Sequence, residues 1–141
     1  MSIDGIARLL NRFSEAVDGR QPVLIAEQFA EDGVFAPGSP LLRGPSAIEA
    51  FFRDRQADPR RTTSHLWSNL RVDPRSEEEA DFRVTLSVYA FEPQVSETDL
   101  QFRIGTVSGR CVRTDGDFWR FVEHRYQRTF TTAMPLTGGR P

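Results

Sequence analysis

The chain of 141 residues contains no lysine, and all 18 of its basic residues are arginine. This absence excludes a Schiff-base lysine, a lysine general base and the lysine of a phosphate-binding loop. The arginines are scattered and the formal net charge is -2, so the composition does not indicate nucleic-acid binding. A coding bias is the simplest explanation of the missing lysine. A functional explanation would require arginines gathered on one face of the fold.

Other scarce residue types indicate the cellular compartment of the protein and argue against a metal site or a membrane span. The single cysteine, Cys111, cannot form an internal disulfide, which fits a reducing compartment. The two histidines lack the spacing of metal ligands. No stretch approaches the ~20 apolar residues of a membrane span, and the first residues, MSIDGIARLLNRF, do not resemble a signal peptide. We therefore expect a cytoplasmic protein without a metal, a membrane partner or a nucleic-acid partner.

The first third of the chain has the patterns of helices. Three helices are predicted, over about residues 3–18, 21–30 and 43–56, with a short strand at 33–36. In the first, apolar residues recur at three- and four-residue steps. Gly19 can adopt the left-handed conformation that ends this helix. Pro22 and Pro45 suit the first turns of the other two.

The rest of the chain has the patterns of long strands. They are predicted over residues 61–73, 80–92, 100–114 and 117–130, with a hairpin turn at Asp115-Gly116 and a loose tail from about residue 131. Helices followed by an antiparallel meander indicate an α+β fold and a single domain over residues 1–141. We expect a cone-shaped barrel whose three helices cover a curved sheet and leave a pocket between the two layers.

Two residues stand out as a candidate proton-transfer pair. His65 lies in the middle of a predicted strand, where alternation places it on one face with Trp67 and Asn69. Asp18 ends the first helix, where the helix dipole disfavours a carboxylate. If that helix crosses the sheet, Asp18 can bond one imidazole nitrogen and leave the other free as a base or acid. A helix-end aspartate and a core histidine with only structural roles remain the alternatives.

The last strand offers further polar residues. Alternation places Trp119, Glu123 and Arg125 on one face and Arg128 on the other, without deciding which face points inward. Glu123 and Arg125 could polarise a ligand or form a plain salt bridge. Tyr89 could donate to a ligand oxygen or pack with its hydroxyl in water.

Five segments in order resemble the SnoaL-like branch of the nuclear transport factor 2-like superfamily: NRFSEAVDGR, FAEDGVF, LLRGPSAIEAFF, TTSHLWSNLRV and DGDFWRFVEHRYQR. The resemblance covers about residues 3–130. It implies a cone-shaped α+β barrel that often forms homodimers. Relatives include scytalone dehydratase, bile acid dehydratases, polyketide cyclases, ketosteroid isomerases and small subunits of ring-hydroxylating dioxygenases.

The resemblance also implies roles for particular residues. The dehydratases pair an aspartate at the end of the first helix with a strand histidine, and Asp18 and His65 match these positions. Arg128 is the nearest match to an arginine that the bile acid enzymes use in their final strand.

Three family positions differ in this chain. The dehydratase tyrosine near Asp18 is replaced by Phe13 or Val17. The second aspartate of the bile acid enzymes falls near Val88 and Tyr89. The ketosteroid isomerase base falls near Pro37, so that mechanism is not expected.

Together these observations favour a small enzyme that needs no cofactor and catalyses a dehydration, isomerisation or cyclisation. An Asp18–His65 dyad would remove a proton from a small apolar, oxygenated substrate. The expected substrate-binding residues are Phe13, Phe51, Trp67, Asn69, Tyr89, Trp119, Glu123, Arg125 and Arg128. The alternative is a non-catalytic ligand-binding protein or an accessory subunit, because the same fold serves both purposes.

Overall fold

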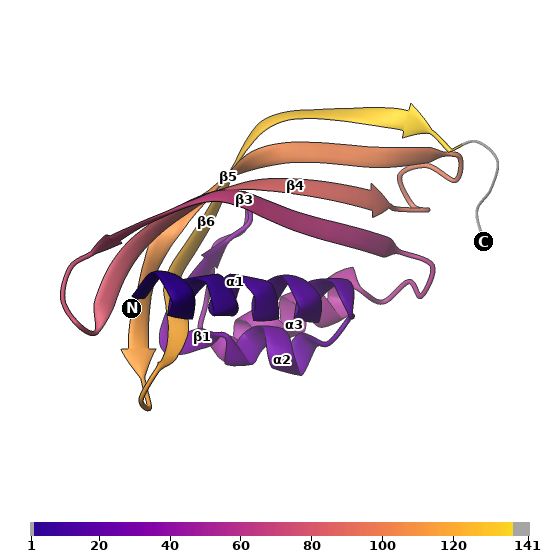
Figure 1. Ribbon diagram of the computed structural model, residues 1–141. Helices are drawn as coiled ribbons and strands as arrows, with labels where there is room; N and C mark the ends of the chain where they lie inside the picture. Colours follow the sequence, from indigo (N-terminus) through magenta and orange to yellow (C-terminus); the bar gives the residue numbers. More distant parts are fainter. Residues whose placement is uncertain (1, 137–141) are drawn as a thin grey trace.

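The computed structural model describes residues 2–136, which form three helices and one six-stranded sheet. The helices are α1 (Ser2–Asp18), α2 (Pro22–Glu27) and α3 (Pro45–Arg55). The strands are β1 (Phe29–Ala36), β2 (Leu42–Arg43), β3 (Thr62–Pro74), β4 (Glu79–Phe91), β5 (Asp99–Thr114) and β6 (Phe118–Pro135). Figure 1 shows the helices grouped on one side of the strongly curved sheet. None of the helices within residues 2–136 is long and apolar enough to cross a membrane.

The sheet is mixed but mostly antiparallel. Its strand order is β2-β1-β6-β5-β4-β3, and only β1 and β6 run parallel to each other. The chain from β3 to β6 is therefore a meander of long neighbouring strands. Asp115 and Gly116, both with positive φ, form the predicted turn between β5 and β6. The predicted α+β class, with helices against a curved sheet, is confirmed.

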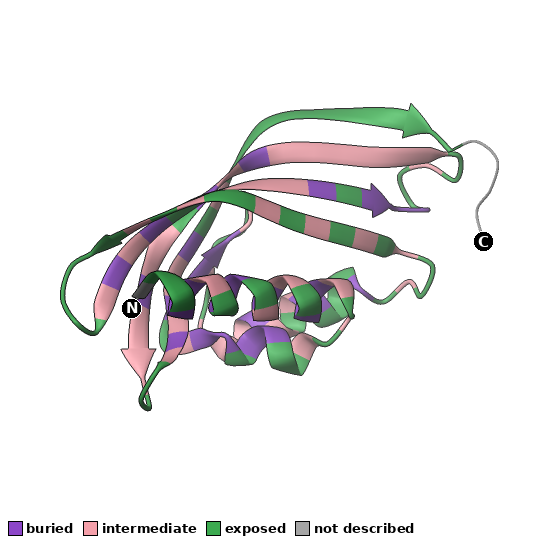
Figure 2. Cartoon of the chain, in the orientation of Figure 1, coloured by how far each residue is buried: buried purple, intermediate pink, exposed green. Residues whose placement is uncertain are grey.

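The helices bury their apolar sides against the concave face of the sheet, where phenylalanine rings form the centre of the core. Phe13 from α1 makes edge-on contacts at centroid distances of 5.4 to 6.4 Å with Phe29, Phe35, Phe52 and Phe121. Such contacts add about 0.5–1.5 kcal/mol each to the burial of the rings. Burial alternates with exposure along the helices (Figure 2).

Several predicted boundaries differ from the observed ones. Helix α2 ends at Glu27 and β1 begins at Phe29, so the expected helix over 21–30 is too long. The two-residue strand β2 carries no pattern long enough to predict. The left-handed residue after α1 is Arg20, with φ 60°, rather than Gly19.

The expected loose tail from about residue 131 is wrong for the part that the structure describes. Strand β6 continues to Pro135 because its last residues pair with the first residues of β5, including Phe102 opposite Thr132 and Asp99 opposite Pro135. Backbone pairing, which composition does not reveal, holds this segment. The remainder of the expected tail, residues 137–141, lies outside the described residues.

Two irregularities change which side chains point inward. In β3 the register shifts between Ser68 and Arg71, and Asn69 has φ 57°. His65 and Trp67, which precede the shift, lie on the inner side of β3, whereas Asn69 is exposed, so the predicted shared face is right for Trp67 and wrong for Asn69. In β6 the register shifts between Phe121 and Glu123. A bulge adds one residue to a strand and so reverses the alternation beyond it.

Beside the bulge in β6, the backbone leaves no room for a side chain at Gly109 of β5. A Cβ atom at Gly109 would lie 1.8 Å from the carbonyl oxygen of Glu123, a backbone atom that cannot rotate away. We expect Gly109→Ala to lower the free energy of unfolding by about 2–3 kcal/mol. The neighbouring Ser108→Ala, at an exposed site, should change it by less than about 0.5 kcal/mol. Urea denaturation of both variants tests this, and equal midpoints would contradict it.

Candidate active site

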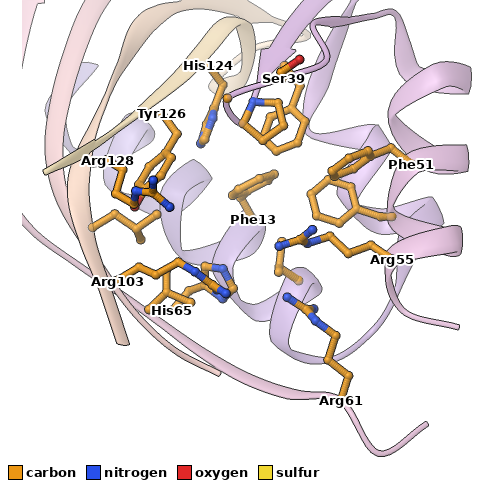
Figure 3. A pocket seen from close by; sticks show the side chains of 17 residues that line it. Phe13, Ser39, Phe51, Arg55, Arg61, His65, Arg103, His124, Tyr126 and Arg128 are labelled. Atoms are coloured by element: carbon orange, nitrogen blue, oxygen red, sulfur yellow. The ribbon is translucent and has the colours of Figure 1, made fainter. Parts of the chain in front are cut away.

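A cavity of ≈ 480 Å³ opens between the helices and the concave face of the sheet (Figure 3). Its apolar walls are formed by Phe13, Phe35, Phe51, Phe52, Leu86 and Val88. Its titratable side chains are Arg55, Arg61, His65, Arg103, His124, Tyr126 and Arg128. The phenylalanines thus serve both as core and as pocket lining, with Phe29 confined to the core.

The predicted contact between Asp18 and His65 is present at the wall of this cavity. Asp18 Oδ1 lies 2.6 Å from His65 Nδ1 and accepts a 2.9 Å hydrogen bond from the Thr63 hydroxyl. The backbone N–H of His65 donates to Asp18 Oδ2 at 2.8 Å. The carboxylate therefore bonds both the ring and the main chain of the same histidine, which fixes the ring against β3.

Polar contacts hold the end of α1 beside the start of β3. Arg20 donates to the carbonyl oxygens of Gln56 at 2.5 Å, Asp58 at 3.0 Å and Arg61 at 2.6 Å. The Gln56 amide donates to the Val17 carbonyl at 3.1 Å. The left-handed backbone at Arg20 directs the chain toward this loop, so the turn after α1 anchors the helix end that carries Asp18.

The charge state of Asp18 determines the tautomer of His65. Burial raises the pKa of this carboxyl group, but hydrogen bonds from the His65 side chain and backbone and from Thr63 outweigh it, and the net pKa is below the usual value. An ionised carboxylate can only accept, so Nδ1 of His65 carries the proton that it donates. Nε2 has no hydrogen-bond partner within residues 2–136 and remains available to the cavity.

His124 is a second histidine of the cavity, which the sequence analysis did not propose for the site. It is 4% exposed and lies among the rings of Phe13, Phe35 and Phe121. Its Nδ1 atom has no hydrogen-bond partner within the described residues. Burial, together with the charge of His65, lowers the pKa of His124 to about 3. His124 is therefore neutral at physiological pH.

Tyr126 and Arg128 continue along the same face of β6. The hydroxyl oxygen of Tyr126 is buried and has no partner within residues 2–136. Burial raises the pKa of Tyr126 despite the opposing charges of Arg103 and Arg128, so the phenol keeps its proton. The cavity thus contains a hydroxyl donor and a guanidinium on the strand next to β5.

The other polar wall consists of three arginines around one carboxylate. Glu92 follows β4 and is bonded by Arg103 and, at 2.9 and 3.1 Å, by Arg61. Arg55 lies 3.9 Å from the same carboxylate. The hydrogen bonds from Arg103 and Arg61 keep the pKa of Glu92 below its usual value although burial raises it. None of these four residues was singled out by sequence, because they lie on four separate segments.

The structure brings only some of the predicted binding residues into the cavity. Phe13, Phe51, His65 and Arg128 line it. Trp67 points to the same side of β3 as His65, but its indole N–H donates to Asn11 at 3.0 Å and it does not line the cavity.

The other predicted binding residues lie away from the cavity. Trp119 is in the core, and Tyr89 packs against Phe102 with 39% exposure. Glu123 and Arg125 form an exposed ion pair at 3.1 Å, because the bulge in β6 turns them outward. Within residues 2–136, no three histidine, cysteine, aspartate or glutamate side chains are grouped so that they could hold a metal ion.

The model of the SnoaL-like domain matches residues 2–125. The chain belongs to the SnoaL-like domain family. No curated protein sequence matches it.

Solved structures of SnoaL-like folds extend this comparison. A protein of Novosphingobium aromaticivorans provisionally assigned as a scytalone dehydratase has a TM-score of 0.84 and 24% identity, over 99% of this chain and 91% of that one. Hexachlorocyclohexane dehydrochlorinase (LinA) type 2 has a TM-score of 0.85 and 18% identity, over 99% and 93%. The type 3 enzyme of Novosphingobium barchaimii has a TM-score of 0.80 and 20% identity, over 97% of this chain and 91% of that one. At these identities the likeness establishes the fold.

Burial of His124 predicts a loss of stability in mild acid. The unfolded chain binds a proton near pH 6.5, whereas the folded chain resists it until about pH 3. The contribution of neutral, buried His124 to the free energy of unfolding is therefore fully present above pH 6.5 and is lost as the pH falls below it. At pH 5 the loss is about 2 kcal/mol.

A variant isolates the contribution of His124. His124→Phe, which places a ring among phenylalanine rings, should remove about 2 kcal/mol of the difference in unfolding free energy between pH 7.5 and pH 5. Urea denaturation of both proteins at the two pH values measures it. The same pH dependence in both proteins would contradict the assignment.

Proposed function

We propose that this protein is a cofactor-independent enzyme that removes a proton from carbon in a small, largely apolar, oxygenated substrate and so catalyses an elimination or a double-bond shift. The observation that carries the proposal is the 2.6 Å contact between Asp18 and His65 at the wall of a cavity. The contact holds the imidazole in one tautomer and directs its basic nitrogen toward the substrate.

The proposed reaction begins with transfer of a substrate proton to His65. Nε2 of His65 takes the proton, and the electron pair of the C–H bond forms the new double bond. In an elimination, the leaving group departs with its bonding pair from the neighbouring carbon. In an isomerisation, the negative charge moves to a carbonyl oxygen instead, and the His65 imidazolium then returns the proton to a different carbon as the carbonyl re-forms.

Tyr126 and Arg128 are suited to the charge that develops. The Tyr126 hydroxyl lacks a hydrogen-bond partner within residues 2–136, and a substrate oxygen would supply one. Arg128 adds a permanent positive charge at the same wall. Tyr126 can thus take the place of the dehydratase tyrosine, which this chain lacks near Asp18.

The structural neighbours support an elimination in particular. Those named as a scytalone dehydratase and as hexachlorocyclohexane dehydrochlorinases carry, by their names, activities that remove water or hydrogen chloride. The dyad also favours an enzyme over a purely ligand-binding protein. A binding protein has no need of a carboxylate that fixes one tautomer of a histidine in its cavity.

Proton abstraction can be measured with a panel of cyclic β-hydroxyketones and chlorinated cyclohexanes, including scytalone and hexachlorocyclohexane. Loss of the C–H signal and release of water or chloride are followed by NMR and ion analysis. We expect at least one compound to be converted, and His65→Ala to lower kcat about 10²–10⁴-fold. Asp18→Asn should also lower kcat, because it removes the ionised acceptor of the Nδ1 proton.

A matched control separates catalysis from damage to the helix. Glu15 lies on α1 one turn before Asp18 and is exposed, so Glu15→Gln should leave kcat unchanged. Conversion at the same rate by wild type and His65→Ala, or of no compound in the panel, would contradict the proposed function.

A further inference from the structure

The cavity that the phenylalanine rings line also carries an excess of positive charge. We define the arginine cluster as Arg55 at the end of α3, Arg61 before β3 and Arg103 in β5. Its three guanidinium groups share a single carboxylate, Glu92. Arg128 adds a fourth guanidinium to the lining, with no ion-pair partner among residues 2–136. Arg128 has a role in the proposed proton abstraction, but that chemistry requires none of the three guanidinium groups of the arginine cluster.

Members of the cluster differ in how fully they are engaged. Arg61 and Arg103 both donate hydrogen bonds to Glu92, and their side chains are 13% and 22% exposed. The Arg55 side chain is 46% exposed and makes no hydrogen bond to any residue within 2–136, and its nearest nitrogen is 3.9 Å from Glu92. Its N–H donors are therefore free to bind a ligand.

Arg55 is nevertheless held at the cavity. Its guanidinium lies 5.9 Å from the centre of the Phe51 ring, which forms part of the apolar wall. In Figure 3 the side chains of Arg55 and Arg61 extend inward on one side of Phe13, while Arg103 and Arg128 lie on the other side with His65. Burial and the neighbouring charges of Arg61 and Arg103 lower the pKa of the Arg55 guanidinium, although the charge of Glu92 raises it.

We propose that Arg55, with the arginine cluster behind it, binds a carboxylate group on the substrate. The proposal rests on the proposed function and names the substrate class: an apolar ring or chain that carries one carboxylate away from the reacting carbon. A planar carboxylate matches the fork of a guanidinium and can accept two parallel hydrogen bonds from it. The substrate carboxylate supplies the negative charge that Glu92 alone does not.

The arrangement assigns an orientation to such a substrate. The carboxylate lies at Arg55, the apolar body contacts Phe13 and Phe51, and the reacting carbon faces His65. Anchoring the far end of the substrate holds the reacting carbon near the base, which is how remote binding contacts contribute to catalysis.

The test compares two probes that differ in charge but not in shape, 2-naphthoate and 2-naphthamide. Isothermal titration calorimetry at low salt measures both affinities for the complete chain. We expect wild type to bind 2-naphthoate at least about tenfold more tightly than 2-naphthamide. Arg55→Gln should reduce this preference to less than about threefold while leaving the affinity for 2-naphthamide unchanged.

Arg53→Gln is the matched control on the same helix. Arg53 is exposed and paired with Glu49 at 2.6 Å outside the cavity, so this variant should keep the full preference. Glu92→Gln removes the competing carboxylate and should strengthen binding of 2-naphthoate. If Glu92→Gln does not fold, the preference for 2-naphthoate over 2-naphthamide in Arg55→Gln and Arg53→Gln is enough to test the carboxylate site.

The outcomes separate this proposal from the proposed function. His65→Ala should keep the preference for 2-naphthoate, because the measurement involves no turnover. Failure of wild type to bind 2-naphthoate more tightly than 2-naphthamide would overturn the carboxylate site and leave the His65 chemistry standing. A full preference in Arg55→Gln, or tighter binding of 2-naphthyl phosphate than of 2-naphthoate, would also overturn it.

Discussion

The hydrogen bonds of Asp18 connect the two layers of this fold at the place where they enclose the cavity. One carboxylate receives the backbone N–H of His65, faces its ring nitrogen and accepts from Thr63, so the end of α1 is joined to β3 at three points. Arg20 and Gln56 reinforce the junction from the adjoining turn and loop. The same contacts thus close one side of the pocket and orient its base.

The rest of the site depends on the irregularities of the sheet. The bulge in β6 places His124, Tyr126 and Arg128 on the cavity face and turns Glu123 outward. The bulge in β3 lies beyond His65 and leaves Asn69 exposed. Phenylalanine rings make much of the remaining wall apolar, and a charge acts more strongly beside an apolar surface than in bulk water.

Sequence predicted the elements better than it predicted the site. Helix and strand periodicity located three helices and four long strands, and the places of Asp18 at a helix end and His65 within a strand made them the candidate pair, which the resemblance then matched to family positions. Strand alternation failed at Asn69 and Glu123, because a one-residue bulge leaves no distinct mark in the pattern. Arg55 and Arg103 were missed for a different reason: they are distant in sequence and only the curvature of the sheet brings them together. The arginines are a composition effect over most of the chain and a functional cluster at this cavity.

Asp18 fixes the proton of His65 on Nδ1 and leaves Nε2 basic toward the cavity. Nitrogen-15 NMR of the imidazole rings at neutral pH measures this directly. We predict that the proton of His65 resides on Nδ1 in wild type and distributes between both nitrogens in Asp18→Asn. A His65 ring that is protonated mainly on Nε2 in wild type would contradict the account.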